Sequence, residues 1–414
     1  MYLNIARLIY LRYSPFIPNF EAIIPQPMKK IKIGLLPKII IAIALGVGAG
    51  YVFPDWLTRV FATFNGVFSQ FLGFIIPLII LGLVAPAIAD IGKQASRMLV
   101  ATVAIAYITT ILSGLLSYLT GVTFFPSMIT PGMLSSTMAE SHELTPYFTI
   151  NIPPLMNVMS ALFLAFIIGI GASRLTTQHT RNIATEFRDI INMVISRVII
   201  PLLPLYIFGI FLNMTVSGQV GGILLAFVKI IVIIFALHVF VLVFQYCTAA
   251  LFARKNPFKM LGTMMPAYFT ALGTQSSAAT IPVSLRQTVK MGVKSNVAGF
   301  VIPLCATIHM SGSTLKIVAC AMALMIANGM AFDFWMFAGF ICMLGITMVA
   351  APGVPGGAIM ASLGLLTSML GFTEADNALM IALYIAMDSF GTACNVTGDG
   401  AIAQIINRFF AKKD

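Results

Sequence analysis

The sequence predicts an all-α polytopic membrane protein, and three observations lead to this fold class. Hydrophobic residues make up 59% of the 414 residues and charged residues only 9%, whereas soluble domains carry about a quarter charged residues. Apolar runs of about 20 residues, long enough to cross ~30 Å of hydrocarbon as helices, recur along the chain. The net charge of +11 is the excess of Lys and Arg typical of cytoplasmic loops, so it does not indicate nucleic-acid binding.

The N-terminal part of the sequence differs from the rest. Residues 1–28 are interpreted as an N-terminal extension, because four prolines interrupt them and their apolar runs are short. No signal peptide is expected there. Met28 and the basic residues after it look like the natural start of the protein. Residues 1–27 are therefore a candidate upstream extension of the reading frame.

The charges of the loops predict six membrane spans between residues 29 and 256. Lys and Arg gather before the first span, after the second, fourth and sixth, and at the C-terminal end, which places these loops and both chain termini in the cytoplasm. The segment 125–148 contains two acids and no Lys or Arg, so it is expected outside. The expected spans are 39–53, 60–89, 98–124, 152–173, 190–213 and a sixth that ends near residue 253.

Two later apolar stretches do not fit this alternation. Residues 260–285 have basic segments on both sides, and residues 335–370 have acidic segments on both sides. Each stretch is therefore expected to return to the side from which it entered, through a tip of small or polar residues. Irregular backbone at membrane depth must be buried in protein or line a wet cavity, so two opposed tips predict a transporter with inverted repeats and a site near the midplane. For 335–370, two full spans are an alternative that the charges leave open.

The last apolar segment, predicted as one helix over residues 378–407, carries a polar stripe. Asp388, Thr392, Asn395 and Asp399 follow one another at spacings of four, three and four residues, so they share one helix face. A carboxylate in hydrocarbon is costly, which makes it a candidate functional residue. Carboxylate, hydroxyl and amide oxygens suit a hard cation or an ammonium group. A face that is hydrogen-bonded to its neighbours for structure is the alternative.

A seventh span, at residues 296–326, contains a predicted break. Pro303 precedes the polar segment 307–313, and unwound carbonyls at such a break can coordinate a cation. His309 lies in the segment, where a core histidine and a proton-coupling histidine are both open interpretations. Lys316 follows it inside apolar sequence.

These motifs resemble those of the dicarboxylate/amino acid:cation symporter family, from about residue 30 to the C-terminus. The resemblance rests on the serine-rich segment 276–282, the segment 307–313, the tip 353–356 and the polar stripe. It implies eight transmembrane helices plus two re-entrant helical hairpins in an inverted-repeat, elevator-type homotrimer. Residues 29–256 would then form mostly the scaffold and trimer contacts, with part of the transport domain. Residues 257–410 would form the transport core, with hairpin 1 at about 257–290, helix 7 at about 296–328, hairpin 2 at about 335–372 and helix 8 at about 376–408.

The resemblance also implies roles for individual residues, with Asp388 holding the α-ammonium of the substrate. The implied substrate-binding residues are Ser276, Ser277, Ser313, Gly353, Val354, Asp388, Gly391, Thr392 and Asn395. The implied sodium ligands are Cys305, Thr307, His309, Asn395, Asp399 and Ala351. Sodium ions are the expected coupling ions, and no organic cofactor is expected.

The departures from the family pattern bear on specificity. Members with acidic substrates carry an Arg where this chain has Gly391, and the acid that supports this Arg is replaced by Tyr384. Without a guanidinium a second carboxylate loses its bidentate partner, which favours a neutral substrate. His309 and Ser311 replace two residues of the third sodium site of the family. We hypothesise that Lys316 reaches this vacated site as a tethered cation, with a lysine paired to a backbone carbonyl as the alternative.

The predicted function is secondary active transport, the sodium-coupled symport of a small neutral amino acid across the cell membrane. A proton- or sodium-coupled dicarboxylate symporter is the alternative, and an ion channel is a remote one. An intramembrane aspartyl protease is disfavoured because both acids lie on one helix, so no enzyme is expected. The expected partners are the substrate, cations, the lipid bilayer and two further copies of the chain.

Overall fold

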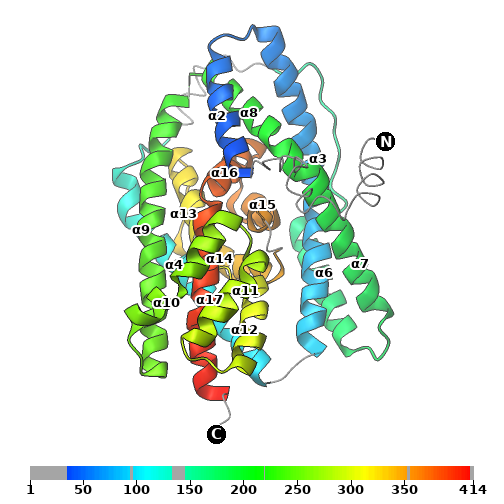
Figure 1. Cartoon of the computed structure of the whole chain (residues 1–414). Coiled ribbons are helices and arrows are strands. Elements are labelled where there is room, and N and C mark those ends of the chain that lie inside the picture. The colour runs from blue at the N-terminus through cyan, green and yellow to red at the C-terminus, as the bar shows by residue number, and fades with distance from the viewer. Residues whose placement is uncertain (1–34, 94–96, 133–144, 219, 352–354, 411–414) are drawn as a thin grey trace, which may run out of the picture. The chain divides into compact units, whose positions relative to one another are not determined.

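The computed structural model describes residues 35–93, 97–132, 145–218, 220–351 and 355–410, and the extension predicted at residues 1–28 lies outside them. Within these ranges the regular structure is helical (Figure 1). The short 3-10 helix η2 is Phe125–Ser127 and the π-helical turn η3 is Ile195–Ile199. The α-helices are α2 (Leu35–Gly50), α3 (Asp55–Lys93), α4 (Arg97–Phe124), α6 (Val158–Arg174), α7 (His179–Val194), α8 (Ile200–Val216), α9 (Val220–Ala253), α10 (Pro257–Thr274), α11 (Ser277–Lys290), α12 (Ser295–Ile308), α13 (Ser311–Ala327), α14 (Phe334–Ala350), α15 (Gly357–Leu370), α16 (Glu374–Ala386) and α17 (Asp388–Phe410).

Several of the helices have the length and apolar character of membrane spans. Five segments of the described residues qualify by length and composition, and the bent pair α16 and α17 would add a sixth if it forms one span. The five are Asp55–Ala89, Arg97–Ser127, His179–Val216, Phe227–Ala253 and Ser295–Ala327. Large apolar side chains such as Phe163, Val232 and Leu251 are exposed, as expected of surfaces that lipid covers. The structure is therefore consistent with a polytopic all-α membrane protein.

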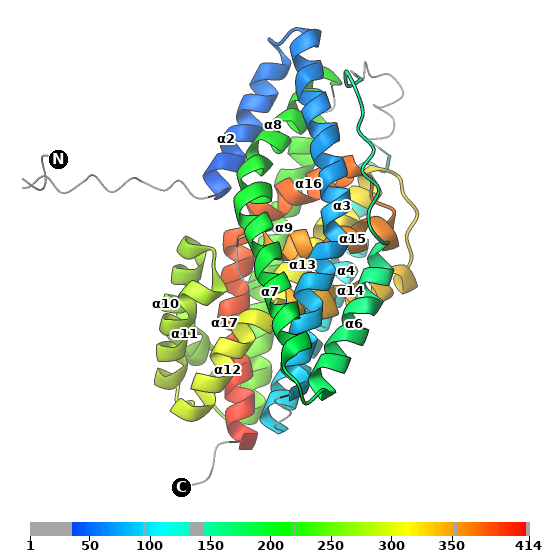
Figure 2. The same ribbon diagram turned by 90° about the vertical axis from the view of Figure 1, so that its right-hand side faces the viewer.

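Helices α13 and α17 lie inside the protein. α17 packs against α9, α10, α12 and α13, and Figure 2 shows it beside α10, α11 and α12. Every residue of α13 is buried. Polar side chains on these two helices are therefore surrounded by other helices, which can supply hydrogen-bond partners that lipid cannot.

Two pairs of helices reverse the chain where the sequence analysis expected hairpins. α10 packs along α11, and Gln275 turns the chain between them with a positive φ of 53°. Ser276 then caps α11, its Oγ accepting from the Ala279 amide at 3.3 Å. α14 packs along α15, which begins after Gly356, another residue with positive φ. The first tip therefore contains irregular backbone at Gln275 and Ser276, and residues 352–354 of the second tip lie outside the described residues.

The break predicted in the seventh span is confirmed. α12 ends at Ile308 and α13 begins at Ser311, with His309 and Met310 between them in non-helical conformations. The first amides of α13 have no partner within their own helix. This leaves them free to bind a side chain of α17.

The prediction of a single last helix over residues 378–407 is wrong. α16 ends at Ala386, α17 begins at Asp388, and their axes differ by 62°. Asp388 thus lies in the first turn of α17, where a negative charge is favoured by the exposed amides and the helix dipole. The bend places the carboxylate at a helix end rather than in the middle of a helix.

Candidate functional site

Asp388 and Lys316 form a buried ion pair between α17 and α13. Lys316 Nζ donates to Asp388 Oδ1 at 2.9 Å, and the two side chains are 0% and 5% exposed. The second oxygen, Oδ2, accepts from the Gly356 amide at 2.8 Å. Asp388 therefore joins the lysine of α13 to Gly356, the residue that precedes α15.

Tyr384 lies beneath the ammonium group. Lys316 Nζ is 3.4 Å from the centre of the Tyr384 ring and 3.4 Å from its backbone carbonyl oxygen. A cation over an aromatic face is attracted by the electrons of the ring, more strongly where water is excluded. The Tyr384 hydroxyl in turn donates to Ser313 Oγ at 3.1 Å.

Asn395 connects α17 to the start of α13. Its Oδ1 accepts from the amides of Gly312 and Ser313, at 2.8 and 3.3 Å, and its Nδ2 donates to Ser313 Oγ at 3.0 Å. The amide side chain therefore satisfies N–H groups that the break in the seventh span leaves unpaired. This contact is a direct result of the non-helical His309 and Met310.

Asp399 pairs with His309 at the same break. His309 Nδ1 lies 2.9 Å from Asp399 Oδ1, and both side chains are buried. A carboxylate accepts, so Nδ1 carries the proton and donates, which leaves Nε2 as an acceptor in the neutral ring. His309 Nε2 has no partner among the described residues.

Three polar residues of α9 complete the site, and sequence reasoning missed all three. Gln245 Nε2 donates to Ser311 Oγ at 3.1 Å, and His238 Nε2 donates to the Gly312 carbonyl at 3.1 Å. The Tyr246 hydroxyl donates to the Thr397 carbonyl at 2.8 Å. His238 and Gln245 are seven positions apart inside an apolar span, which places them on one helix face, and this signal could have identified them.

Comparison with known proteins decides the family. The sodium:dicarboxylate symporter family matches residues 35–409. The chain belongs to this family. It is therefore a transporter and not an enzyme, and sodium is the coupling ion that membership implies.

The curated relatives of this symporter include proteins of two bacterial species. A serine/threonine transporter, SstT, of Acinetobacter baylyi is 27% identical over 392 residues, which cover 89% of this chain and 96% of the relative. Serine/threonine transporters of the same name from two strains of Acinetobacter baumannii are each 27% identical over 391 residues, which cover 89% of this chain and 95% of each relative.

The structure does not gather all the residues that the resemblance implied. Thr307 is exposed, and its hydroxyl donates to the carbonyl of Leu304 in its own helix at 2.7 Å. The Cys305 carbonyl accepts from the His309 amide at 2.8 Å. Five other residues of the implied site are buried: Cys305, Ala351, Ser277, Gly391 and Thr392. Gly353 and Val354 lie outside the described residues.

Hairpin α10–α11 touches the start of α17 through a residue that was not assigned to the site. Gln275 Nε2 donates to Ser389 Oγ at 2.8 Å, next to Asp388. Ser276 is half-buried, and Ser277 is buried in the first turn of α11. The tip of this hairpin therefore lies beside the Lys316–Asp388 pair.

Lys316 is not placed as our sequence hypothesis required. That hypothesis put its ammonium at the position vacated around His309 and Ser311, but Nζ binds Asp388 instead. His309 and Ser311 already have partners in Asp399 and Gln245. The correction has a steric basis, because the missing side chain of Gly391 leaves room for the ammonium: a Cβ there would lie 2.8 Å from Nζ.

The surroundings of Asp399 fit a hard cation. Gln245 Oε1 is buried without a hydrogen-bond partner among the described residues, as is His309 Nε2. Both side chains lie against Gly398, the residue before Asp399. The unpaired amide oxygen thus lies against the residue before a buried carboxylate, and both groups are oxygen ligands of the kind that a hard cation such as Na⁺ prefers.

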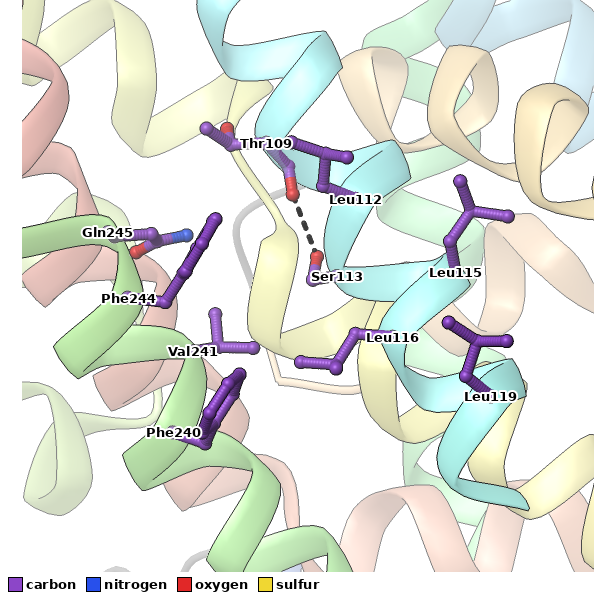
Figure 3. A pocket seen from close by; sticks show the side chains of 10 residues that line it. All are labelled: Thr109, Leu112, Ser113, Leu115, Leu116, Leu119, Phe240, Val241, Phe244 and Gln245. Atoms are coloured by element: carbon purple, nitrogen blue, oxygen red, sulfur yellow. Dashed lines mark hydrogen bonds between the residues drawn. The ribbon is translucent and has the colours of Figure 1, made fainter. Parts of the chain in front are cut away.

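An apolar cavity beside Gln245 does not reach the polar stripe of α17. It has a volume of about 400 Å³ and lies between α4 and α9. Figure 3 shows that leucine and phenylalanine side chains line it, with Gln245 at its edge. None of the four stripe residues of α17 lines this cavity, so it is not the candidate substrate site.

If sodium binds beside Asp399, as we propose below, a methyl group at position 398 should weaken its binding. The Cβ of a Gly398→Ala variant would overlap Gln245 Oε1 and lie 2.8 Å from His309 Cε1. Overpacking of this kind costs about 1–3 kcal/mol, so we expect the sodium concentration for half-maximal transport to rise about tenfold. Transport measured against sodium concentration in proteoliposomes tests this. Gly262→Ala is the matched control, because no atom lies within 4 Å of that added Cβ, and an unchanged sodium response in Gly398→Ala would contradict the assignment.

Proposed function

We propose that this chain is a sodium-coupled symporter of small neutral amino acids, with serine and threonine as substrates. Relatives that match nearly the whole chain are named serine/threonine transporters. Asp388 is the proposed anchor for the substrate ammonium, since it is a buried carboxylate at a helix break beside two hairpin tips. A buried carboxylate gains more from an ammonium than from a neutral group.

The proposal of a neutral substrate rests on the contacts of the Lys316 ammonium. A dicarboxylate needs a second cation, and Lys316 is the one buried lysine or arginine side chain among the described residues. Its ammonium is paired with Asp388 and rests on the Tyr384 ring, and this ring and the Tyr384 carbonyl also hold the charge when a substrate ammonium takes its place on Asp388. A substrate with a single carboxylate leaves no charge that requires this lysine.

Sodium would enter this mechanism at Asp399. In our proposal the cation binds near Asp399, Gln245 Oε1 and the backbone of the break, and it neutralises a carboxylate that is costly to move through hydrocarbon. Asn395 couples the two positions, because it holds the first turn of α13 while sharing α17 with both aspartates. Loading with sodium would thus favour substrate binding.

The finer architecture is part of the same proposal. The hairpins α10–α11 and α14–α15 would be re-entrant and gate the site from opposite sides, with residues 257–410 as the transport core and residues 29–256 mostly as scaffold. The chain would act as an elevator-type homotrimer in the cell membrane, with both termini cytoplasmic. The packing of α17 against α10, α12 and α13 supports a core that moves as one unit.

Uptake by purified protein in proteoliposomes tests the function. We expect saturable accumulation of labelled serine and threonine with an inward sodium gradient, and none when choline replaces sodium. Labelled aspartate and succinate are tested in the same way, and unlabelled alanine serves as a competitor. Uptake of aspartate or succinate without uptake of serine would overturn the neutral substrate, and a sodium current that does not saturate with any amino acid would indicate a channel.

A further inference from the structure

We propose that Lys316 is a tethered counter-ion for Asp388. Its ammonium occupies the place of the substrate ammonium whenever the site is empty, and the substrate displaces it on binding. This inference rests on the proposed function, since it assumes that Asp388 receives the substrate.

The first argument is the competition for one oxygen. Asp388 Oδ2 is taken by the Gly356 amide, and Oδ1 is taken by Lys316 Nζ. A substrate α-ammonium is the same chemical group as the ammonium of lysine. Each carboxylate oxygen can accept two hydrogen bonds, but the space beside Oδ1 is filled by Nζ, so a substrate ammonium that binds there competes with Lys316.

The second argument concerns the groups, other than Asp388, that contact the Lys316 ammonium. The Tyr384 ring and carbonyl oxygen are each 3.4 Å from Nζ, and Gly391 presents no side chain to it. A flexible four-carbon stem lets the ammonium leave Asp388. The aromatic face and the carbonyl continue to solvate the charge after it has moved. The Tyr384 ring and carbonyl can therefore hold the displaced ammonium close to Asp388 without a bond to the carboxylate.

The consequence concerns the empty carrier. An unpaired carboxylate would hinder the return of the empty site through the membrane. With Lys316 on Asp388 this pair carries no net charge in the empty carrier, and in the loaded carrier the substrate ammonium pairs with Asp388 instead. Lys316 therefore allows the empty carrier to return, while loaded carrier does not need it.

Two transport assays in proteoliposomes separate these steps. Net uptake, into vesicles without internal serine and with an inward sodium gradient, requires the empty carrier to return. Exchange of labelled for unlabelled serine, with equal sodium on both sides, does not. The readout is the ratio of net uptake to exchange for each variant.

Lys316→Met removes the charge at similar volume, and Lys316→Gln keeps a hydrogen-bond donor for Asp388. We expect the ratio to fall at least about tenfold in both, because a charge in the membrane is strongly unfavourable, and to be retained in Lys316→Arg. Serine binding to the purified variants without the charge should also tighten, since the competitor is gone. Net uptake and exchange falling together in folded protein would overturn the proposal, as would an unchanged ratio.

A second variant tests the inference with the lysine intact. The methyl group of Gly391→Ala would lie 2.8 Å from Nζ and should push the ammonium away from Asp388, so the ratio should fall in the same direction. An unchanged ratio in folded Gly391→Ala counts against the proposal even if the lysine variants do not fold. Wild-type protein that neither takes up nor exchanges serine would refute the proposed function instead.

Discussion

Asp388→Asn will abolish serine transport. Asparagine keeps the shape of the side chain, but it has no charge to hold the substrate ammonium, and it leaves the buried ammonium of Lys316 without a counter-ion. Removing one partner of a buried pair costs about 3–5 kcal/mol, which corresponds to a loss of uptake of at least ~100-fold. Sodium-dependent uptake of labelled serine in proteoliposomes measures it, and uptake above a tenth of wild type would contradict the assignment.

A double variant distinguishes the two causes of this loss. Asp388→Asn should lower the midpoint of thermal unfolding, and adding Lys316→Met should restore much of it, because no charge is then left unpaired. Transport should stay absent in the double variant. The control is Asp376→Asn, which alters another buried acid that caps α16 and bonds Asn328. This variant should lose about 1 kcal/mol of stability and still transport serine.

Asp399→Asn will uncouple transport from sodium. The amide oxygen can still accept the hydrogen bond from His309 Nδ1, so the fold should be preserved. The full negative charge that attracts the cation is gone, however, and we expect the sodium concentration for half-maximal uptake to rise at least ~100-fold, equivalent to ~2.7 kcal/mol. Uptake as a function of sodium concentration measures the change.

The matched control for Asp399 lies two positions away. Thr397 is buried in the same helix, and it binds Tyr246 through its backbone carbonyl rather than its side chain. Thr397→Val keeps the shape of the side chain, so its sodium response should stay within about twofold of wild type. Equal effects of both variants would mean that packing of α17, not the carboxylate, controls the sodium response.

Sequence reasoning identified the polar stripe because of helical spacing. Asp388 and Asp399 stand out among apolar residues, and the three- and four-residue steps place the stripe on one face. The break at His309 and the turns at Gln275 and Gly356 were visible for a similar reason: small or polar residues interrupt long apolar runs. These features depend on local sequence, so they required no knowledge of which helices meet.

The partners of these residues could not be predicted in the same way. The Lys316–Asp388 bond joins positions 72 residues apart, and the Gln245–Ser311 bond joins positions 66 apart. Such contacts depend on how helices pack, which spacing along one helix does not reveal. The bend at Met387 was missed because the sequence there contains neither Gly nor Pro, the usual marks of a helix break. Contacts of Asp388 with other elements accompany it instead.

The complete burial of α13 bears on how the protein is made. Helices of a membrane protein leave the ribosome in order, and α13 emerges with its lysine well before α17 supplies Asp388. During that interval Lys316 must stay in water or at the interface, because an unpaired ammonium inserts poorly into hydrocarbon. Stable insertion of α13 is therefore expected only after α17 has been made. The ion pair at the transport site would then also control a late step of membrane insertion.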